Sequence, residues 1–178
     1  MMNDPDGGFQ NGEGASFSCF ASAEGLAKCA AFMANKGTFQ GHQLISEATW
    51  DAFHDGIDVK IEAMGLMRWV YNQGGAAVHK KEERDKLPWD DKLMDKGGMS
   101  SLVEDTGAEN NEGWIGWMGM GGSNMKWHPE LKISIGYTCS RLIWLDFNCL
   151  KATEFQKIAV DITKDIMDKN EGVWTPNT

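Results

Sequence analysis

The sequence has 178 residues, enough for one domain or for one domain and part of another, and its 42% hydrophobic and 24% charged content is typical of a globular protein. Its 17 basic and 26 acidic residues give a net charge of −9, which argues against nucleic acid and against an anionic membrane surface as partners. No apolar run is long enough to span a membrane.

The first elements in chain order are two helices. Ser22 can cap the N-terminus of the first helix, and Gly37 ends it. The narrow apolar stripe of this helix consists of Leu26, Cys29, Ala30 and Met33. Residues 38–45 predict a short turn, after which Ser46 caps a second helix over 47–54.

The middle of the chain predicts one strand and one long connection. Residues 64–72 carry Leu66, Trp69 and Tyr71 in a pattern that favours a strand. Residues 76–112 are polar and contain few periodic apolar positions, so we expect a long surface loop.

Residues 113–141 predict two strands around a turn. Three glycines in 118–123 allow the backbone there to pass close to another group or to adopt a positive φ. Residues 128–131 predict a turn because Pro fixes φ at an early position. Residues 132–138 then alternate in the manner of a half-buried strand.

The last predicted element is a helix over about 148–168, with a strongly amphipathic pattern. Its apolar face consists of Phe155, Ile158, Ala159, Ile162 and Ile166. These elements together predict an α+β fold, in which an antiparallel sheet is flanked by helices.

Cysteine usage and the chain's first residues suggest the compartment. Cys19, Cys29, Cys139 and Cys149 form neither a CxxC pair nor a zinc-type cluster, so we expect buried free thiols, no metal and a reducing environment. The first ten residues resemble neither a secretory signal nor a mitochondrial leader, which predicts a cytoplasmic protein. A mitochondrial location stays open if this N-terminus is incomplete. The eight Trp and eleven Met are expected in a core or interfaces, and no cofactor is expected.

Two blocks of sequence resemble a known family. Residues 14–37, followed by Gly-His-Gln-Leu-Ile-Ser-Glu-Ala-Thr over 41–49, resemble a family loop, a helix and the pattern Gly-x-x-Leu-Leu-Ser-x-x-Thr. Residues 117–130 are similar to the pattern His/Lys-Thr-Gly-x-Gly-Gly-Ser followed by Asp-Pro-Glu. The family is that of the β-lactamase-related serine hydrolases, which includes class C β-lactamases, penicillin-binding-protein-like esterases and mitochondrial β-lactamase-like proteins. Only the C-terminal half of such a domain is matched.

The resemblance implies a fold and a binding site. The fold would be like the C-terminal part of a β-lactamase or transpeptidase domain, over residues 14–169. An N-terminal loop over 1–13 and a tail over 170–178 would flank it. One wall of the family's pocket corresponds to Trp117, Gly119, Gly121, Gly122 and Ser123.

The groups that carry catalysis in this family are missing. Its Ser-x-x-Lys and Tyr-x-Asn motifs lie upstream of the matched region, and neither Tyr71 nor Tyr137 has Asn two positions later. Trp117 stands where the third motif has Lys or His. Ser123 and Lys126 match Ser-x-x-Lys literally, but in a strand such residues point to opposite faces, so we interpret the match as coincidence. We therefore assign no catalytic residue.

Three functions follow from these observations. The first, which we favour, is a non-catalytic structural or binding subunit that binds a protein partner or a second copy through the face left by the missing lobe. The second is a fragment or subunit of an active esterase or peptidase, with a small acyl, ester or peptide ligand. It needs an upstream nucleophile segment, and N–H groups of residues 119–123 would stabilise the oxyanion. The third is an unrelated binding module with a Trp-rich platform, which is favoured if residues 113–141 do not form adjacent antiparallel strands.

Overall fold

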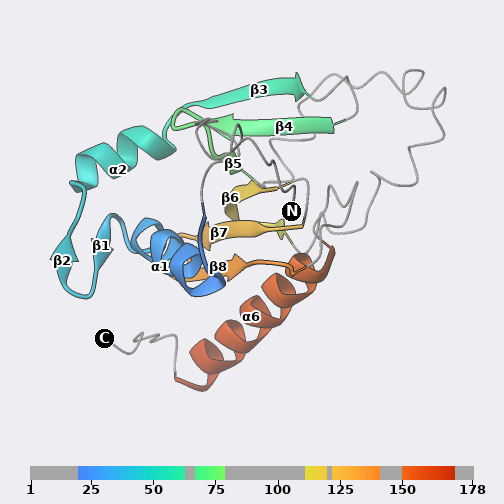
Figure 1. Ribbon diagram of the computed structural model, residues 1–178. Helices are drawn as coiled ribbons and strands as arrows, with labels where there is room; N and C mark the ends of the chain where they lie inside the picture. Colours follow the sequence, from blue (N-terminus) through green and yellow to red (C-terminus); the bar gives the residue numbers. More distant parts are fainter. Residues whose placement is uncertain (1–19, 63–66, 79–110, 120–121, 141–149, 171–178) are drawn as a thin grey trace, which may run out of the picture.

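The computed structural model describes residues 20–62, 67–78, 111–119, 122–140 and 150–170 (Figure 1). The predicted loop over 1–13, residues 79–110 of the predicted long loop and residues 171–178 of the predicted tail lie outside these ranges, as do Gly121, Cys19 and Cys149.

The described strands form a six-stranded sheet and a separate two-stranded hairpin. In the large sheet each strand pairs antiparallel with the next strand in the chain, so the spatial order is the sequence order. Its strands are β3 (Ile57–Glu62), β4 (Met67–Asn72), β5 (Ala77–Val78), β6 (Ile115–Met118), β7 (Asn124–His128) and β8 (Ile133–Tyr137). The hairpin consists of β1 (Thr38–Phe39) and β2 (His42–Gln43). An antiparallel sheet with helices confirms the predicted α+β class.

Several strands differ from the prediction. Residues 113–141 contain three adjacent antiparallel strands instead of two, because the glycine-rich residues 118–123 connect β6 to β7. β3 was not predicted, although its sequence Ile-Asp-Val-Lys-Ile-Glu alternates with the period of a strand. β5 begins inside the predicted loop over 76–112, and the predicted turn over 38–45 is the β1–β2 hairpin.

The first two helices begin where their caps predicted, and the last, predicted from about 148, begins at Leu150. They are α1 (Ala23–Ala34), α2 (Glu47–His54) and α6 (Leu150–Lys169). Ser22 Oγ accepts a hydrogen bond from the N–H of Gly25 at 3.1 Å, and Ser46 Oγ accepts one from the N–H of Thr49 at 3.1 Å. Each hydroxyl satisfies a backbone donor that has no partner inside the helix.

α1 lies directly on the last two strands of the sheet (Figure 1). Gly136 in β8 makes this close approach possible, since a Cβ there would lie 2.3 Å from the carbonyl oxygen of Ala23 and 2.5 Å from the nitrogen of Ala27. Ser134, two positions earlier on the same face of β8, donates its hydroxyl to the carbonyl oxygen of Ala27 at 3.1 Å. The absence of a side chain at Gly136 therefore allows the backbone of α1 to pack directly on β8.

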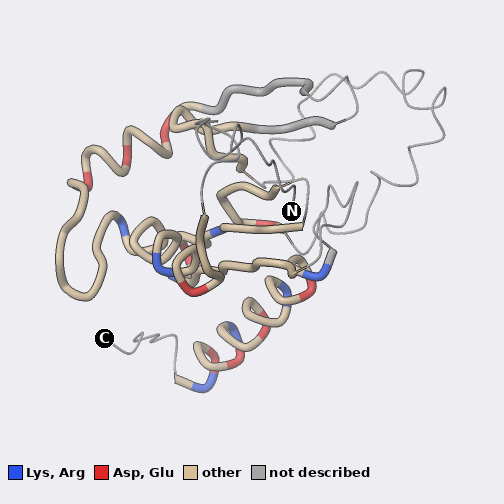
Figure 2. Tube along the Cα trace, viewed as in Figure 1, with Lys and Arg blue, Asp and Glu red and all other residues tan. Residues whose placement is uncertain are grey.

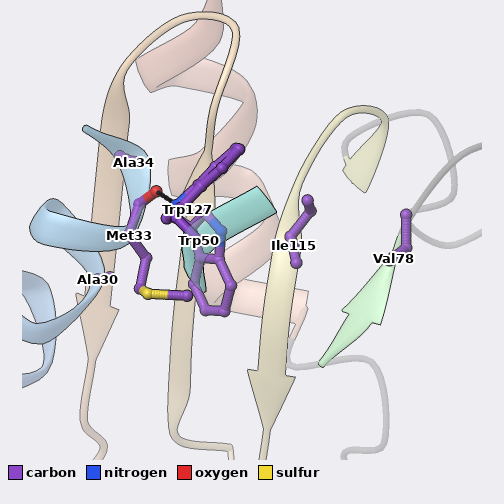
Figure 3. Packing of buried hydrophobic residues seen from close by; sticks show 7 residues of the cluster. All are labelled: Ala30, Met33, Ala34, Trp50, Val78, Ile115 and Trp127. Carbon is purple, nitrogen blue, oxygen red and sulfur yellow. Dashed lines mark hydrogen bonds between the residues drawn. The ribbon is translucent and has the colours of Figure 1, made fainter. Parts of the chain in front are cut away.

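The hydrophobic core lies between this face of the sheet and the two N-terminal helices. Figure 3 shows Trp50 from α2 and Trp127 from β7 packed beside Met33 from α1. The indole nitrogen of Trp50 donates to the carbonyl oxygen of Met33 at 2.7 Å. The buried cluster also includes Ala30, Ala34, Val78 and Ile115. The expectation that Trp and Met build the core is confirmed for these residues.

The described cysteines are free thiols. Cys29 is exposed and Cys139 is half-buried, so the prediction of a buried thiol is wrong for Cys29. The reason is the rotation of α1, which buries Ala30, Met33 and Ala34 against the sheet and leaves Cys29 at the margin of that face.

Candidate functional site

The described residues of the predicted pocket wall are Trp117 in β6 and Gly119, Gly122 and Ser123 between β6 and β7. The N–H of Gly119 donates to the carbonyl oxygen of Ser123 at 2.7 Å, and the N–H of Gly122 donates to the carbonyl oxygen of Gly119 at 2.9 Å. Gly122 has φ of 99°, a conformation that favours glycine. These two N–H groups therefore hold the turn together and are already paired within the chain.

Trp117 is the exposed aromatic residue of this region. Its side chain is 46% exposed and stacks on the ring of Tyr71 in β4, with ring centroids 5.7 Å apart and planes inclined by 27°. The pair joins two strands that are distant in sequence. It offers a flat aromatic surface, but no group of three His, Cys, Asp or Glu that could hold a metal occurs anywhere among the described residues.

The literal Ser-x-x-Lys match does not lie in a helix: Lys126 belongs to β7 and Ser123 immediately precedes that strand. Lys126 is fully buried, and its ammonium donates to the side-chain oxygen of Asn111 at 2.5 Å. The helical geometry that would place positions three apart on one face is therefore missing. This geometry does not provide a serine activated by a lysine.

Lys126 is part of a buried polar network that connects the sheet to α6. The amide nitrogen of Gln156 donates to the same Asn111 oxygen at 2.9 Å, and its amide oxygen accepts from Asn124 at 3.0 Å. All four residues are at most 7% exposed. The side-chain oxygen of Asn124 is buried without a hydrogen-bond partner among the described residues.

The two faces of β7 thus have different characters. Trp127 packs in the hydrophobic core with α1 and α2, whereas its neighbour Lys126 and the alternate residue Asn124 lie on the opposite face, with α6. β7 therefore makes apolar contacts on one face and hydrogen bonds to α6 on the other, where Met118, Ala152 and Tyr137 add a small apolar cluster.

α6 does not bury the face that its sequence pattern predicts. Phe155, Ile158 and Ile162 are 50%, 51% and 55% exposed, and only Ala159 and Ile166 of the predicted apolar face are half-buried. The buried residues of the helix are instead Ala152, Thr153, Gln156 and Thr163. We call the three exposed residues Phe155, Ile158 and Ile162 the outer stripe of α6. Within the stripe, the Phe155 ring approaches Tyr137 of β8, with ring centroids 6.0 Å apart.

The sequence pattern missed this orientation for a physical reason. The amphipathic pattern assigns polar residues such as Gln156 and Thr163 to the solvent-facing side of the helix. That assignment fails when the sheet provides buried polar partners for the helix. Those partners, Asn124 and Asn111, are 32 and 45 positions away from Gln156. The signal in the sequence was the polar alternation of Asn124, Lys126 and His128 in a strand, which marks a polar face.

Histidine 54 connects the two central tryptophans. Its Nδ1 contacts the carbonyl oxygen of Trp50 at 2.8 Å, and its Nε2 accepts from the indole N–H of Trp127 at 3.0 Å. Only the neutral ring with its proton on Nδ1 satisfies both bonds. Burial is the largest influence on the group and lowers the pKa of His54, which agrees with the neutral form.

The sequence predicted His128 in the turn over 128–131. In the structure His128 is the last residue of β7, and the turn begins at the residue after it. Its Nδ1 accepts from the N–H of Leu131 at 3.3 Å, and its ring packs edge-on against Trp114. Burial lowers the pKa of His128 in the same way. Both histidines therefore act as structural hydrogen-bond acceptors in their neutral form.

Comparisons of the chain with protein-family models, with curated proteins and with solved structures gave no match. The family resemblance therefore stands on the sequence motifs alone. Among the described residues, no helix combines the length and the apolar character needed to cross a membrane.

Proposed function

We propose that the chain is a non-catalytic binding module that contacts another protein through the outer stripe of α6. The observation that carries this proposal is the orientation of the helix: Gln156 is buried and bonded to Asn124 of β7, and Thr163 is buried, while Ile158 and Ile162 are about half exposed. A contiguous apolar surface rimmed by charged residues is the usual mark of a protein-interaction site.

The polar network explains why the stripe stays outside. Turning α6 by about a third of a rotation would bury the stripe, but it would remove Gln156 from Asn111 and Asn124. Each buried polar group left without a partner costs about 1–3 kcal/mol. The network therefore orients the polar side of the helix toward the sheet. The apolar side stays exposed and can contact a group outside the described part of the chain.

Kinship with the β-lactamase-related hydrolases, as a relative without catalytic activity, is part of the same proposal. It is supported by the two sequence blocks and by the order of elements, in which an amphipathic helix follows the last strand of an antiparallel sheet. The hydrolase alternative is weakened because the N–H groups of Gly119 and Gly122 are paired within the turn. The third hypothesis, an unrelated module, would have been favoured had residues 113–141 not formed adjacent antiparallel strands, and they do form them.

Hydrolysis assays test the non-catalytic part of the proposal. The full chain and its Ser123→Ala variant are incubated with a chromogenic cephalosporin and with p-nitrophenyl acetate. We expect equal rates for the two proteins, at the level of a control protein of similar size. Turnover that the Ser123→Ala substitution abolishes would refute the proposal.

Site-directed crosslinking tests the binding part. A photo-reactive phenylalanine analogue replaces Ile158, and in a matched control it replaces the adjacent Lys157, which is exposed but lies about 100° around the helix. Illumination of cells that express each variant should give a discrete protein adduct at position 158 and a much weaker one at 157. Absence of an adduct at 158, or equal adducts at both positions, would contradict the proposed surface.

A further inference from the structure

We infer that the partner of the outer stripe is a second copy of this chain, with the two α6 helices packed antiparallel. This inference rests on the proposed function, because it names the protein that the stripe binds. It is carried by the arrangement of charged residues on the same line of the helix. Figure 2 shows that residues of both signs are distributed along α6.

The stripe has the spacing of a helix–helix seam. Its apolar residues are separated by three and four positions, and continuing that alternation places Lys151 before Phe155 and Asp165 after Ile162. Lys151 and Asp165 are both exposed. The seam is therefore three apolar residues long, with a cation at its N-terminal end and an anion at its C-terminal end.

The position of these two charges selects the orientation. Lys151 and Asp165 both lie seven positions from Ile158, on either side of it. A twofold axis beside Ile158 therefore brings Lys151 of one copy next to Asp165 of the other, at both ends of the seam. The same axis places Phe155 opposite Ile162 of the second copy, so aromatic and aliphatic surfaces cover each other.

A parallel pair would have the opposite electrostatics. Lys151 would face Lys151 of the second copy, and Asp165 would face its own equivalent, so like charges would flank the apolar residues at both ends. The antiparallel pair does bring Glu154 near Asp161 of the second copy at the rim. Asp161 and Asp165 each form an ion pair on their own helix, with Lys157 and with Lys169, so both contacts between copies compete with an existing pair and each contributes little. The difference that remains is at the ends of the seam, where the antiparallel pair joins opposite charges and the parallel pair joins like charges.

The size of the seam sets the strength of the contact. A 20-residue helix is about 30 Å long, and three half-exposed apolar residues per copy bury less area than a standard specific complex, which places the contact among weak, transient interfaces. We expect a reversible dimer with a dissociation constant on the order of 10 µM.

Sedimentation equilibrium of the full chain, over about 1–500 µM, tests the inference. We expect a monomer–dimer equilibrium, and Ile158→Asp should raise the dissociation constant by more than about tenfold. Lys157→Ala, one position away, should leave it within about twofold, since its side chain lies outside the seam. Circular dichroism of each variant checks that α6 remains folded.

Charge reversal tests the orientation. Lys151→Glu alone and Asp165→Lys alone should each weaken the dimer, whereas the double variant should restore it, because the pairs are then reversed at both ends. A monomer at every concentration, a dimer that tolerates Ile158→Asp, or a double variant that fails to recover would each overturn the inference. A monomer whose position 158 crosslinks to a different protein would overturn the inference alone, whereas the lack of any adduct would overturn the proposed function.

Discussion

Gly136 is the point of closest approach between α1 and β8, and its replacement by alanine measures how rigid this contact is. The added Cβ would lie 2.3 Å from the carbonyl oxygen of Ala23, 2.5 Å from the nitrogen of Ala27 and 2.9 Å from Cβ of Leu26. Two of these atoms are backbone atoms of a helix, so the clash can be relieved only if α1 moves as a unit. Overpacking of this kind costs about 1–3 kcal/mol.

The expected net loss for Gly136→Ala is about 2 kcal/mol, because two clashes with backbone atoms put the overpacking cost near about 3 kcal/mol and alanine recovers about 0.5–1 kcal/mol of backbone entropy relative to glycine in a strand. For a protein of this size that loss lowers the melting temperature by about 4–8 °C. Thermal unfolding followed by circular dichroism measures the shift. The matched control is Gly25→Ala within α1, where a Cβ would meet only Ser22 Oγ at 3.4 Å and should raise stability by up to about 1 kcal/mol. Equal effects of the two substitutions would refute the close packing of α1 on β8.

Three further predictions concern the hydrogen bonds around the two faces of the sheet. Burial lowers the pKa of His54 and of His128 below the unfolded value of about 6.5, so the unfolded state binds protons more readily than the folded state. The contribution of the two neutral rings to stability should therefore be complete above about pH 6.5 and be lost as the pH falls through the folded-state pKa. Urea unfolding between pH 8 and pH 5 measures this loss, and a flat profile would contradict it. Trp127→Phe removes the indole donor to His54 and part of the buried ring, and should lower the free energy of unfolding in urea by about 2–3 kcal/mol. A loss below about 0.5 kcal/mol would show that this hydrogen bond is absent in solution. Asn111→Ala removes the acceptor that the buried Lys126 ammonium shares with the Gln156 amide of α6. We expect the free energy of unfolding to fall by about 3 kcal/mol and amide exchange in α6 to become faster. Unchanged exchange in α6 would contradict the role of the network.

The elements with local signals were predictable from the sequence. Ser22 and Ser46 cap helices because each hydroxyl needs only a backbone N–H three residues later. The alternation of residues 132–138 corresponds to β8 (Ile133–Tyr137). β5 could not be predicted, because its two residues form a strand only through pairing with β4 and β6.

The candidate site could be predicted only in part. The glycine-rich connection and Trp117 were identified, but local patterns could not show that the N–H groups of Gly119 and Gly122 pair within the turn. The orientation of α6 depends on partners of Gln156 that lie on β7 and before β6, so the amphipathic pattern assigned the wrong face. Nonlocal hydrogen bonds of this kind outweigh hydrophobic periodicity when the sheet face is itself polar.

The orientation of α6 is the central claim, and a pair of alanine variants tests it most directly. Urea unfolding is followed by Trp fluorescence at a protein concentration low enough to keep the chain monomeric. Gln156→Ala should reduce the free energy of unfolding by about 1–3 kcal/mol, because it leaves the buried amide of Asn124 without its acceptor. Ile158→Ala should change it by less than about 0.5 kcal/mol, since this side chain is half exposed and alanine favours the helix. A loss of about 2–5 kcal/mol for Ile158→Ala, with no effect of Gln156→Ala, would mean that the apolar face is buried and would contradict the account.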